Sequence, residues 1–87
     1  MHPEDVAYHD IANAIIIQAV EDYRNALDGQ SYNGYPPEVI IKRIEKFFRS
    51  RYFRILTTVD GEYIIARLKQ EHSERNKNES HIDTSNT

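Results

Sequence analysis

Apolar residues in the first third of the chain recur with the period of an α-helix. They follow one another at steps of four, four, three and four residues, which stacks them on one face. These residues are Ala12, Ile16, Val20, Tyr23 and Leu27, with Ile15 and Ala19 beside them. Pro3 suits a first turn, and Asp28-Gly29 supplies a stop because glycine readily adopts the left-handed conformation that ends helices. The pattern predicts one long helix from about Glu4 to Leu27.

A second apolar stripe follows a segment rich in turn-forming residues. Residues 30–37 read Gln-Ser-Tyr-Asn-Gly-Tyr-Pro-Pro. The Asn33-Gly34 pair favours a turn, and the two prolines discourage helix just before them. A second helix is therefore predicted to begin at Pro36 or Pro37, with Glu38 in its first turn. Its apolar side chains are Ile40, Ile41, Ile44, Phe47 and Phe48.

The next segment admits two interpretations. In the first, residues 51–57 form a short helix capped by Ser50, and Asp60 caps a final helix from residue 61 to about residue 72. In the second, residues 52–59 and 62–68 pair as a β-hairpin, since Asp60-Gly61 is a strong two-residue turn signal. Both interpretations respect the local chemistry, so the spacing of apolar residues has to decide.

That spacing favours helix. A half-buried strand alternates apolar and polar residues, whereas Tyr63, Ile64 and Ile65 are consecutive and Leu68 follows Ile64 by four. The predicted fold is therefore an all-α bundle of three or four helices, with an α+β fold carrying a hairpin at 52–68 as the alternative. In the helical version the buried residues are Tyr52, Phe53, Leu56, Ile64, Ile65 and Leu68.

The carboxyl-terminal residues differ in composition from the rest. Ile82 is the one apolar residue among the fifteen at 73–87, so this segment cannot bury enough surface to offset its ordering entropy. A single helical domain at 1–72 with a flexible polar tail at 73–87 is predicted. A length of 87 residues suits one small core, and the absence of cysteine excludes disulfides and thiolate metal sites.

Charge is distributed unevenly along the chain. The formal net charge is −3, but residues 1–35 hold six acids and one base, whereas residues 36–70 hold eight bases and four acids. An acidic first segment is thus followed by a basic middle. Two such segments can neutralise each other within one molecule, or pair across a two-fold axis in a homodimer.

The basic middle is the strongest functional signal. Its aromatic neighbours Phe47, Phe48, Tyr52 and Phe53 suggest base stacking if they are exposed and core packing if they are not. Either way the charges would favour the phosphates of a nucleic acid or an acidic protein surface. The six candidate contact residues are Lys42, Arg43, Lys46, Arg49, Arg51 and Arg54.

Two smaller sets of residues are also candidates for partner binding. Tyr32 and Tyr35 flank the Asn-Gly turn, and an exposed tyrosine pair in a stiffened loop would anchor a partner. Glu21, Asp22 and Asp28 could instead mimic phosphates and occupy a nucleic-acid channel of the target.

The chain carries none of the common catalytic or metal-binding motifs. No Gly-x-Ser-x-Gly elbow, phosphate-binding glycine loop or His-Glu-x-x-His pair is present, so we expect no enzyme activity and no cofactor. Asp5 and His9 would share a helix face, but two ligands make a weak metal site, and none is predicted. The longest apolar run, 14–17, is far too short to cross a membrane, and we expect a cytoplasmic protein.

Several short blocks resemble one family. Phe-Phe-Arg-Ser at 47–50, Tyr-Phe at 52–53, Leu-Thr at 56–57, Asp-Gly-Glu-Tyr-Ile-Ile at 60–65 and Asp-Tyr-Arg at 22–24 are similar to small uncharacterised accessory proteins of Gram-positive phages, prophages and conjugative elements. The resemblance implies a protein that binds and blocks a host or phage macromolecule in the bacterial cytoplasm. Nucleic-acid-binding nucleases of host defence, CRISPR nucleases included, are among the partners it implies. The alternative is a small nucleic-acid-binding regulator that uses residues 42–54.

Overall fold

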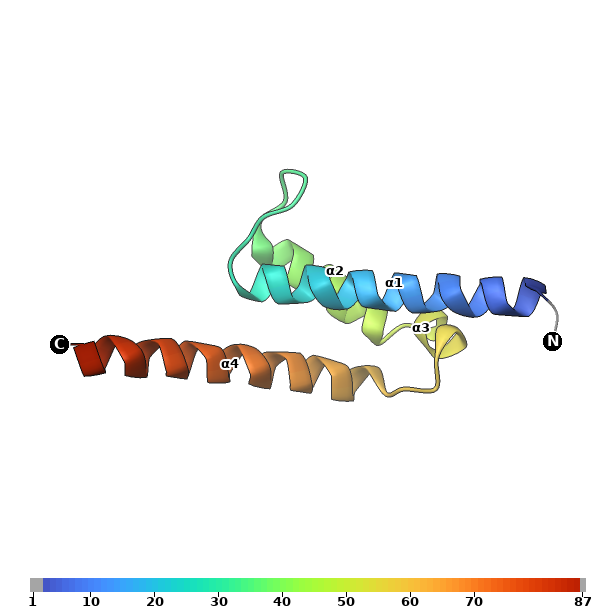
Figure 1. Cartoon of the computed structure of the whole chain (residues 1–87). Coiled ribbons are helices and arrows are strands. Elements are labelled where there is room, and N and C mark those ends of the chain that lie inside the picture. Colours follow the sequence, from blue (N-terminus) through green and yellow to red (C-terminus); the bar gives the residue numbers. More distant parts are fainter. Residues whose placement is uncertain (1–2, 87) are drawn as a thin grey trace.

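Four α-helices make up the described part of the chain, and no strand is present there. A computed structural model describes the backbone of residues 3–86 and the side chains of residues 10–76. The helices are α1 (Pro3–Leu27), α2 (Pro37–Phe48), α3 (Arg51–Leu56) and α4 (Gly61–Asn86), as Figure 1 shows. The all-α prediction is confirmed, and the alternative hairpin at 52–68 is wrong because that segment contains α3 and the start of α4.

Local chemistry explains where the helices begin and end. After α1, Gly29 adopts a φ of +91°, and its N–H donates to the carbonyl of Ala26 at 3.0 Å. The next N–H, of Gln30, donates to the carbonyl of Asn25 at 3.0 Å, which completes a Schellman motif. The predicted stop at Asp28-Gly29 is therefore confirmed in its geometry.

Both predicted amino-terminal caps are also present. The Ser50 hydroxyl accepts a hydrogen bond from the Phe53 N–H at 3.1 Å, and an Asp60 carboxylate oxygen accepts one from the Glu62 N–H at 3.0 Å. Each cap satisfies an N–H that has no partner within its own helix. The short helix α3 ends at Leu56, one residue before the predicted end.

The final helix is much longer than predicted. The prediction placed its end near His72, whereas α4 continues to Asn86. That boundary was wrong because low apolar content removes burial but does not interrupt helical hydrogen bonding, and residues 73–86 contain no glycine or proline. Side chains four residues apart also pair along it, Gln70 with Glu74 and His72 with Asn76, each at 3.1 Å. The predicted flexibility of residues 73–87 stays a prediction.

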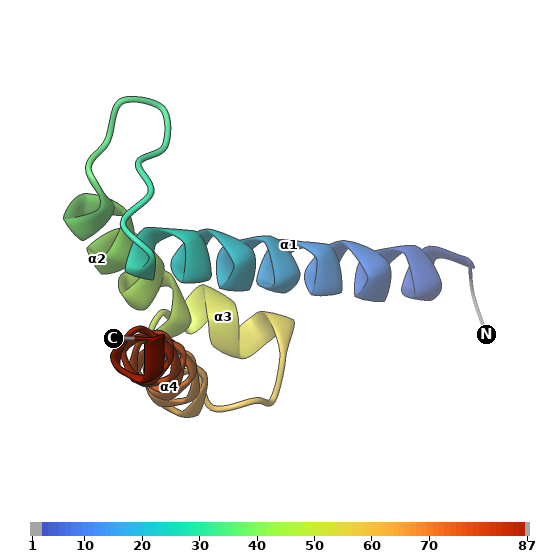
Figure 2. The same ribbon diagram turned by 60° about the vertical axis from the view of Figure 1, so that its left-hand side comes forward.

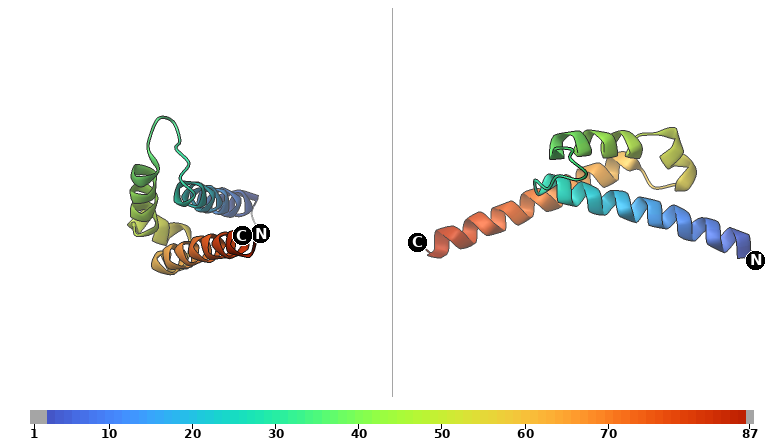
Figure 3. Two further views of the ribbon diagram at one scale, coloured as in Figure 1. Left: turned by 90° about the vertical axis from the view of Figure 1, so that its left-hand side faces the viewer. Right: turned by 90° about the horizontal axis from the view of Figure 1, so that it is seen from above.

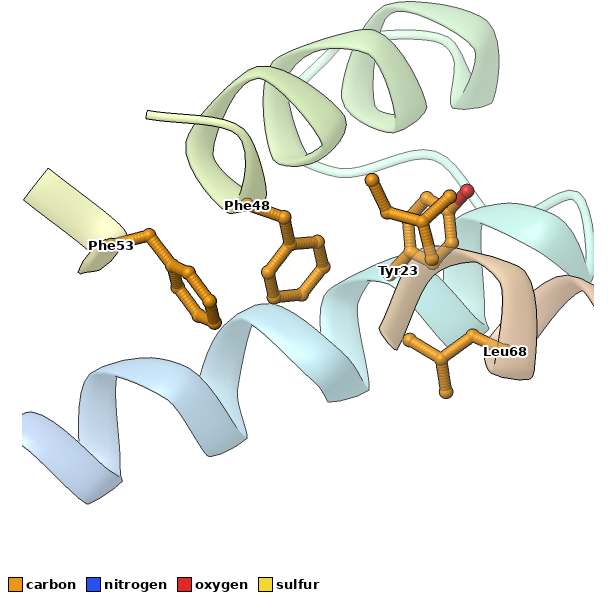
Figure 4. Packing of buried hydrophobic residues seen from close by; sticks show 5 residues of the cluster. Tyr23, Phe48, Phe53 and Leu68 are labelled. Carbon is orange, nitrogen blue, oxygen red and sulfur yellow. The ribbon is translucent and has the colours of Figure 1, made fainter. Parts of the chain in front are cut away.

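A cluster of aromatic rings joins the four helices (Figure 4). Tyr23 of α1, Phe48 of α2 and Phe53 of α3 are the largest fully buried side chains described. The Phe48 ring meets the other two edge to face, with centroids 6.1 Å from Tyr23 and 5.4 Å from Phe53. Ile65 and Leu68 of α4 complete the cluster. Each edge-to-face pair contributes about 0.5–1.5 kcal/mol beyond the area it buries, so this junction holds the fold together.

Tyr52 departs from the predicted core. Its side chain is exposed, whereas its neighbour Phe53 is fully buried. Successive residues of a helix point about 100° apart, so the short helix α3 cannot direct both rings inward. Tyr52 still lies against the half-buried Phe47, with ring centroids 6.1 Å apart.

The two long helices extend well beyond the aromatic junction. Figure 2 shows the amino-terminal half of α1 running out past α3, and Figure 1 shows α4 extending in the opposite direction. Seen from above, α1 and α4 cross (Figure 3). The molecule measures 60 × 29 × 20 Å, with a radius of gyration of 16.2 Å, compared with roughly 12 Å for a compact domain of this length. Long stretches of helix surface therefore lack a partner within the described chain.

Candidate interaction surfaces

One face of α2 carries exposed bases opposite the side that enters the core. Lys42, Lys46 and Arg49 share this face because they lie three or four residues apart, and Arg43 lies beside it. Lys42 and Lys46 form no ion pair with any carboxylate of residues 10–76. Their charge is available to a partner.

Arg49 has a different role from its two neighbours. Its guanidinium donates a hydrogen bond to the Glu62 carboxylate at the start of α4 and lies 3.6 Å from the Glu45 carboxylate on its own helix. The ion pair with Glu62 connects the end of α2 to α4. Arg49 therefore helps to hold the helices together, and the exposed positive charge of α2 rests mainly on the other bases.

Glu45 is the centre of a polar junction between three helices. The Tyr23 hydroxyl of α1 donates a hydrogen bond to Glu45 at 2.6 Å, and the Lys69 ammonium of α4 lies 3.3 Å from the same carboxylate oxygen. The hydrogen bond from Tyr23 is the main cause that lowers the pKa of Glu45. Burial, followed by the hydrogen bond to Glu45, raises the pKa of Tyr23 well above its usual range. Both groups therefore keep their ordinary charge states at neutral pH.

The tyrosine loop forms a tight, exposed turn. Tyr32 and Tyr35 exchange two backbone hydrogen bonds, of 3.2 and 2.9 Å, and the two residues between them, Asn33 and Gly34, both have positive φ, at 51° and 80°. Two central residues with positive φ characterise a type I′ turn, for which Asn-Gly is the preferred sequence. Both tyrosine side chains are exposed, and the loop rises from the helices (Figure 2).

A cation–π contact joins this loop to the basic face. The Arg43 guanidinium carbon lies 4.2 Å from the centre of the Tyr35 ring. Such contacts contribute about 0.5–1 kcal/mol at exposed sites. Arg43 therefore orients Tyr35 against the start of α2, and the loop and the basic face form one surface. We call it the tyrosine–lysine surface; its residues are Tyr32, Tyr35, Lys42, Arg43 and Lys46.

The two arginines of α3 lie apart from this surface. Arg51 and Arg54 are exposed on the short helix that follows α2. Arg54 borders an open hollow of about 550 Å³, but carboxylates of Asp60 and Glu62 line the same hollow. Arg49 lines this hollow too, so Arg54 lies near Arg49 but among carboxylates.

The three predicted acidic residues are separated as well. Asp28 lies 3.2 Å from His72 and 3.4 Å from Arg75, both on α4. Asp22 accepts a hydrogen bond from Gln18 at 3.0 Å, while the exposed Glu21 points about 100° away around the helix. The structure does not gather them into a single cluster.

The ion pairs between helices differ from those that the sequence suggests. The acidic first helix and the basic second helix were candidates for mutual pairing, but within residues 10–76 no ion pair joins α1 to α2. The pairs between elements all involve α4. They are Arg24–Glu71, Asp28–His72, Asp28–Arg75, Glu45–Lys69 and Arg49–Glu62. The segregation of charge between α1 and α2 consequently persists in the folded chain.

An apolar groove between α1 and α2 was missed by sequence reasoning. It has a volume of about 550 Å³, and six of its nine lining residues are apolar. The signal was present in Ile11 and Ile15, which lie beside the predicted stripe of α1. Periodicity identified the stripe but could not show that α2 would leave its edge uncovered.

The described chain shows no cluster of metal ligands and no helix suited to spanning a membrane. Within residues 10–76 no three His, Cys, Asp or Glu side chains lie together as metal ligands would. Asp5 and His9 fall outside the residues whose side chains are described. None of the helices within residues 3–86 combines the length and apolar character that crossing a bilayer requires.

Comparisons of the chain with family models, curated proteins and solved structures found no match.

Proposed function

We propose that this chain is a non-enzymatic accessory protein of a phage or other mobile element, and that it binds and blocks a host protein in the bacterial cytoplasm. The tyrosine–lysine surface is the contact, and the target, of which a nuclease of host defence is one example, presents an acidic patch to it. The mobile-element context comes from the resemblance of residues 47–65 described above. The binding surface rests on the positions of exposed tyrosines and lysines in the fold.

The observation that carries this proposal is the contact of Arg43 with the Tyr35 ring. It joins exposed aromatic rings to unpaired lysines on one side of the molecule. Tyrosine and arginine are enriched among the residues that dominate protein–protein binding energy. Tyrosine in addition offers a large contact area with few rotatable bonds. The tight turn also limits the entropy that the loop loses when a partner binds.

The lysines contribute differently from the tyrosines. Lys42 and Lys46 are exposed, so their attraction to a partner is screened by salt over about 8–10 Å. Such charges accelerate association and select partners more than they add affinity. Loss of one lysine should therefore slow binding and reduce its salt dependence, whereas loss of a tyrosine should speed dissociation.

Affinity capture with matched variants tests the proposal. The full chain, Lys42→Glu and Tyr32→Ala are each used to capture proteins from a host lysate. Arg67→Glu is the control, since Arg67 is an exposed base within a helix, lies on α4 and undergoes the same change in charge. A stoichiometric protein retained by the full chain and by Arg67→Glu, but depleted with the other two variants, supports the proposal. Equal recovery by all four proteins, or no stoichiometric partner, would refute it.

Direct nucleic-acid binding is the competing outcome. Exposed Lys42, Lys46, Arg51 and Arg54 could neutralise phosphates, and each released counterion would steepen the dependence of affinity on salt. Titration into labelled duplex and single-stranded DNA at two salt concentrations separates the cases. Tight binding that weakens steeply with salt and is lost in Lys42→Glu, but not in Arg67→Glu, would replace the protein target by DNA.

A further inference from the structure

The apolar groove between α1 and α2 lies beside the tyrosine–lysine surface and has no occupant within the described chain. From α1 it is lined by Ile11, Ala14, Ile15 and Ala19, and from α2 by Ile44 and Phe47. Polar residues stand among them, Gln18 and Asp22 on α1 and Arg43 on α2. An apolar floor with charged edges is the composition of a protein interface.

The groove exists because the apolar surface of α1 is wider than the area that the other described helices cover. Ala12 is 3% exposed, whereas Ile11, one position around the same helix, is 60% exposed. The α4 helix crosses α1 (Figure 3) and pairs with it at Arg24, near the carboxyl-terminal end of α1, and α2 and α3 are short, with 12 and 6 residues. The outer flank of α1 is left open over roughly 16 Å, the rise of residues 11–22.

We propose that a second copy of this chain fills the groove, with the two α1 helices packed antiparallel about a two-fold axis. Because α1 supplies one wall of the groove, a two-fold rotation inserts the Ile11 and Ile15 ridge of each copy into the other copy's groove, beside Ile44 and Phe47. The two α1 and two α2 helices then enclose a shared four-helix core. The contact is closed, so association stops at the dimer.

Charge complementarity identifies the occupant as another copy. On the groove side of α1, Asp22 lines the groove and Asp10 precedes Ile11 at its amino-terminal end, while the edge of the groove on α2 carries Arg43. Since no ion pair joins α1 to α2 within residues 10–76, both charges remain unbalanced there. The two-fold arrangement lays the acidic α1 of each copy against the basic-edged α2 of the other. Antiparallel packing also keeps Glu21 and Asp22 of one α1 helix away from those of the other.

The dimer is tested by its mass and by two matched isoleucine variants. Ile11→Glu places a charge in the groove, and Ile17→Glu is the control, because Ile17 is similarly exposed, at 57%, on another flank of the same helix. Both positions are exposed, so both variants should fold, which far-ultraviolet circular dichroism verifies. Sedimentation velocity of the full chain is measured over roughly three decades of concentration around the micromolar range.

The expected result is a mass that rises with concentration from 10.2 kDa to twice that value. Ile11→Glu should raise the dissociation constant of the dimer at least ten-fold, whereas Ile17→Glu should leave it unchanged. Arg43→Glu should weaken the dimer less at high salt than at low salt. A monomer at every concentration, equal effects of the two isoleucine variants, or growth beyond the dimer would overturn the proposal. The capture experiment varies Lys42 and Tyr32, and neither residue lines the groove, so its outcome is distinguishable from that of the dimer test.

Discussion

Replacement of Tyr23 by phenylalanine probes the polar junction without disturbing the aromatic one. The ring that packs edge to face against Phe48 stays in place, and only the hydroxyl that donates to Glu45 at 2.6 Å is removed. The variant therefore isolates a single hydrogen bond between α1 and α2.

The magnitude follows from the charge of the acceptor. A hydrogen bond to a charged group contributes about 1.5–3 kcal/mol to stability. Glu45 keeps Lys69 at 3.3 Å and Arg49 at 3.6 Å and is partly exposed, so its carboxylate is not left without partners. We therefore expect a loss of about 1.5–2 kcal/mol, at the low end of the range. For a chain of this size that lowers the melting temperature by roughly 6–16 °C.

The assay is urea unfolding followed by circular dichroism at about pH 7 and about pH 2. The Tyr23 hydrogen bond lowers the pKa of Glu45, so the difference between the two proteins should shrink at the lower pH, where Glu45 is protonated and accepts a weaker bond. Tyr63→Phe is the control, because Tyr63 is 65% exposed and should change stability by less than about 0.5 kcal/mol. A loss below about 0.5 kcal/mol for Tyr23→Phe, or an equal loss at both pH values, would refute this reasoning.

Three further substitutions test other contacts. Glu45→Gln should lower the free energy of unfolding by about 1–2 kcal/mol at pH values above the ordinary glutamate pKa. The loss should decrease as the pH falls through the lowered pKa of Glu45, because the folded state favours the ionised form of this carboxyl group. Denaturant unfolding at several pH values measures this dependence. Gly61→Ala should lower the free energy of unfolding by about 2–3 kcal/mol in the same assay, since a Cβ at this position would overlap the Phe48 backbone carbonyl. A near-neutral result would contradict the close packing of Gly61 against Phe48. Ser50→Ala should lower stability by about 1 kcal/mol through loss of the cap on the Phe53 N–H, detectable as a lower melting temperature, whereas an unchanged melting temperature would show that the cap is dispensable.

Much of the fold was predictable because its causes are local. The four-residue step from Ile64 to Leu68 distinguished helix from hairpin, and Ser50 and Asp60 marked helix starts through hydrogen bonds to residues two or three positions away. The same local rules failed at the end of α4. There the low apolar content predicts an end near His72, although the backbone hydrogen bonds of the helix continue to Asn86.

The candidate site was less predictable, because exposure and pairing depend on distant residues. Arg49 and Lys42 lie on the same face of α2, yet among the side chains of residues 10–76 only Arg49 of these two meets a carboxylate of α4. Asp28 similarly meets His72 and Arg75, more than forty positions away in the sequence. Nothing in the local pattern distinguishes the charges that are paired from those that are not.

The sequence by itself determined which residues form helices, where most of those helices begin and end, and that charge is segregated between the first two. These properties follow from hydrogen bonds and apolar spacings within a few residues of each other. The tertiary structure alone decided that α4 pairs with the charges of α1 and α2, that Arg43 holds Tyr35 against the basic face, and that the outer flank of α1 stays uncovered. Those outcomes depend on how helices far apart in the chain pack around Phe48, and no local pattern encodes that packing.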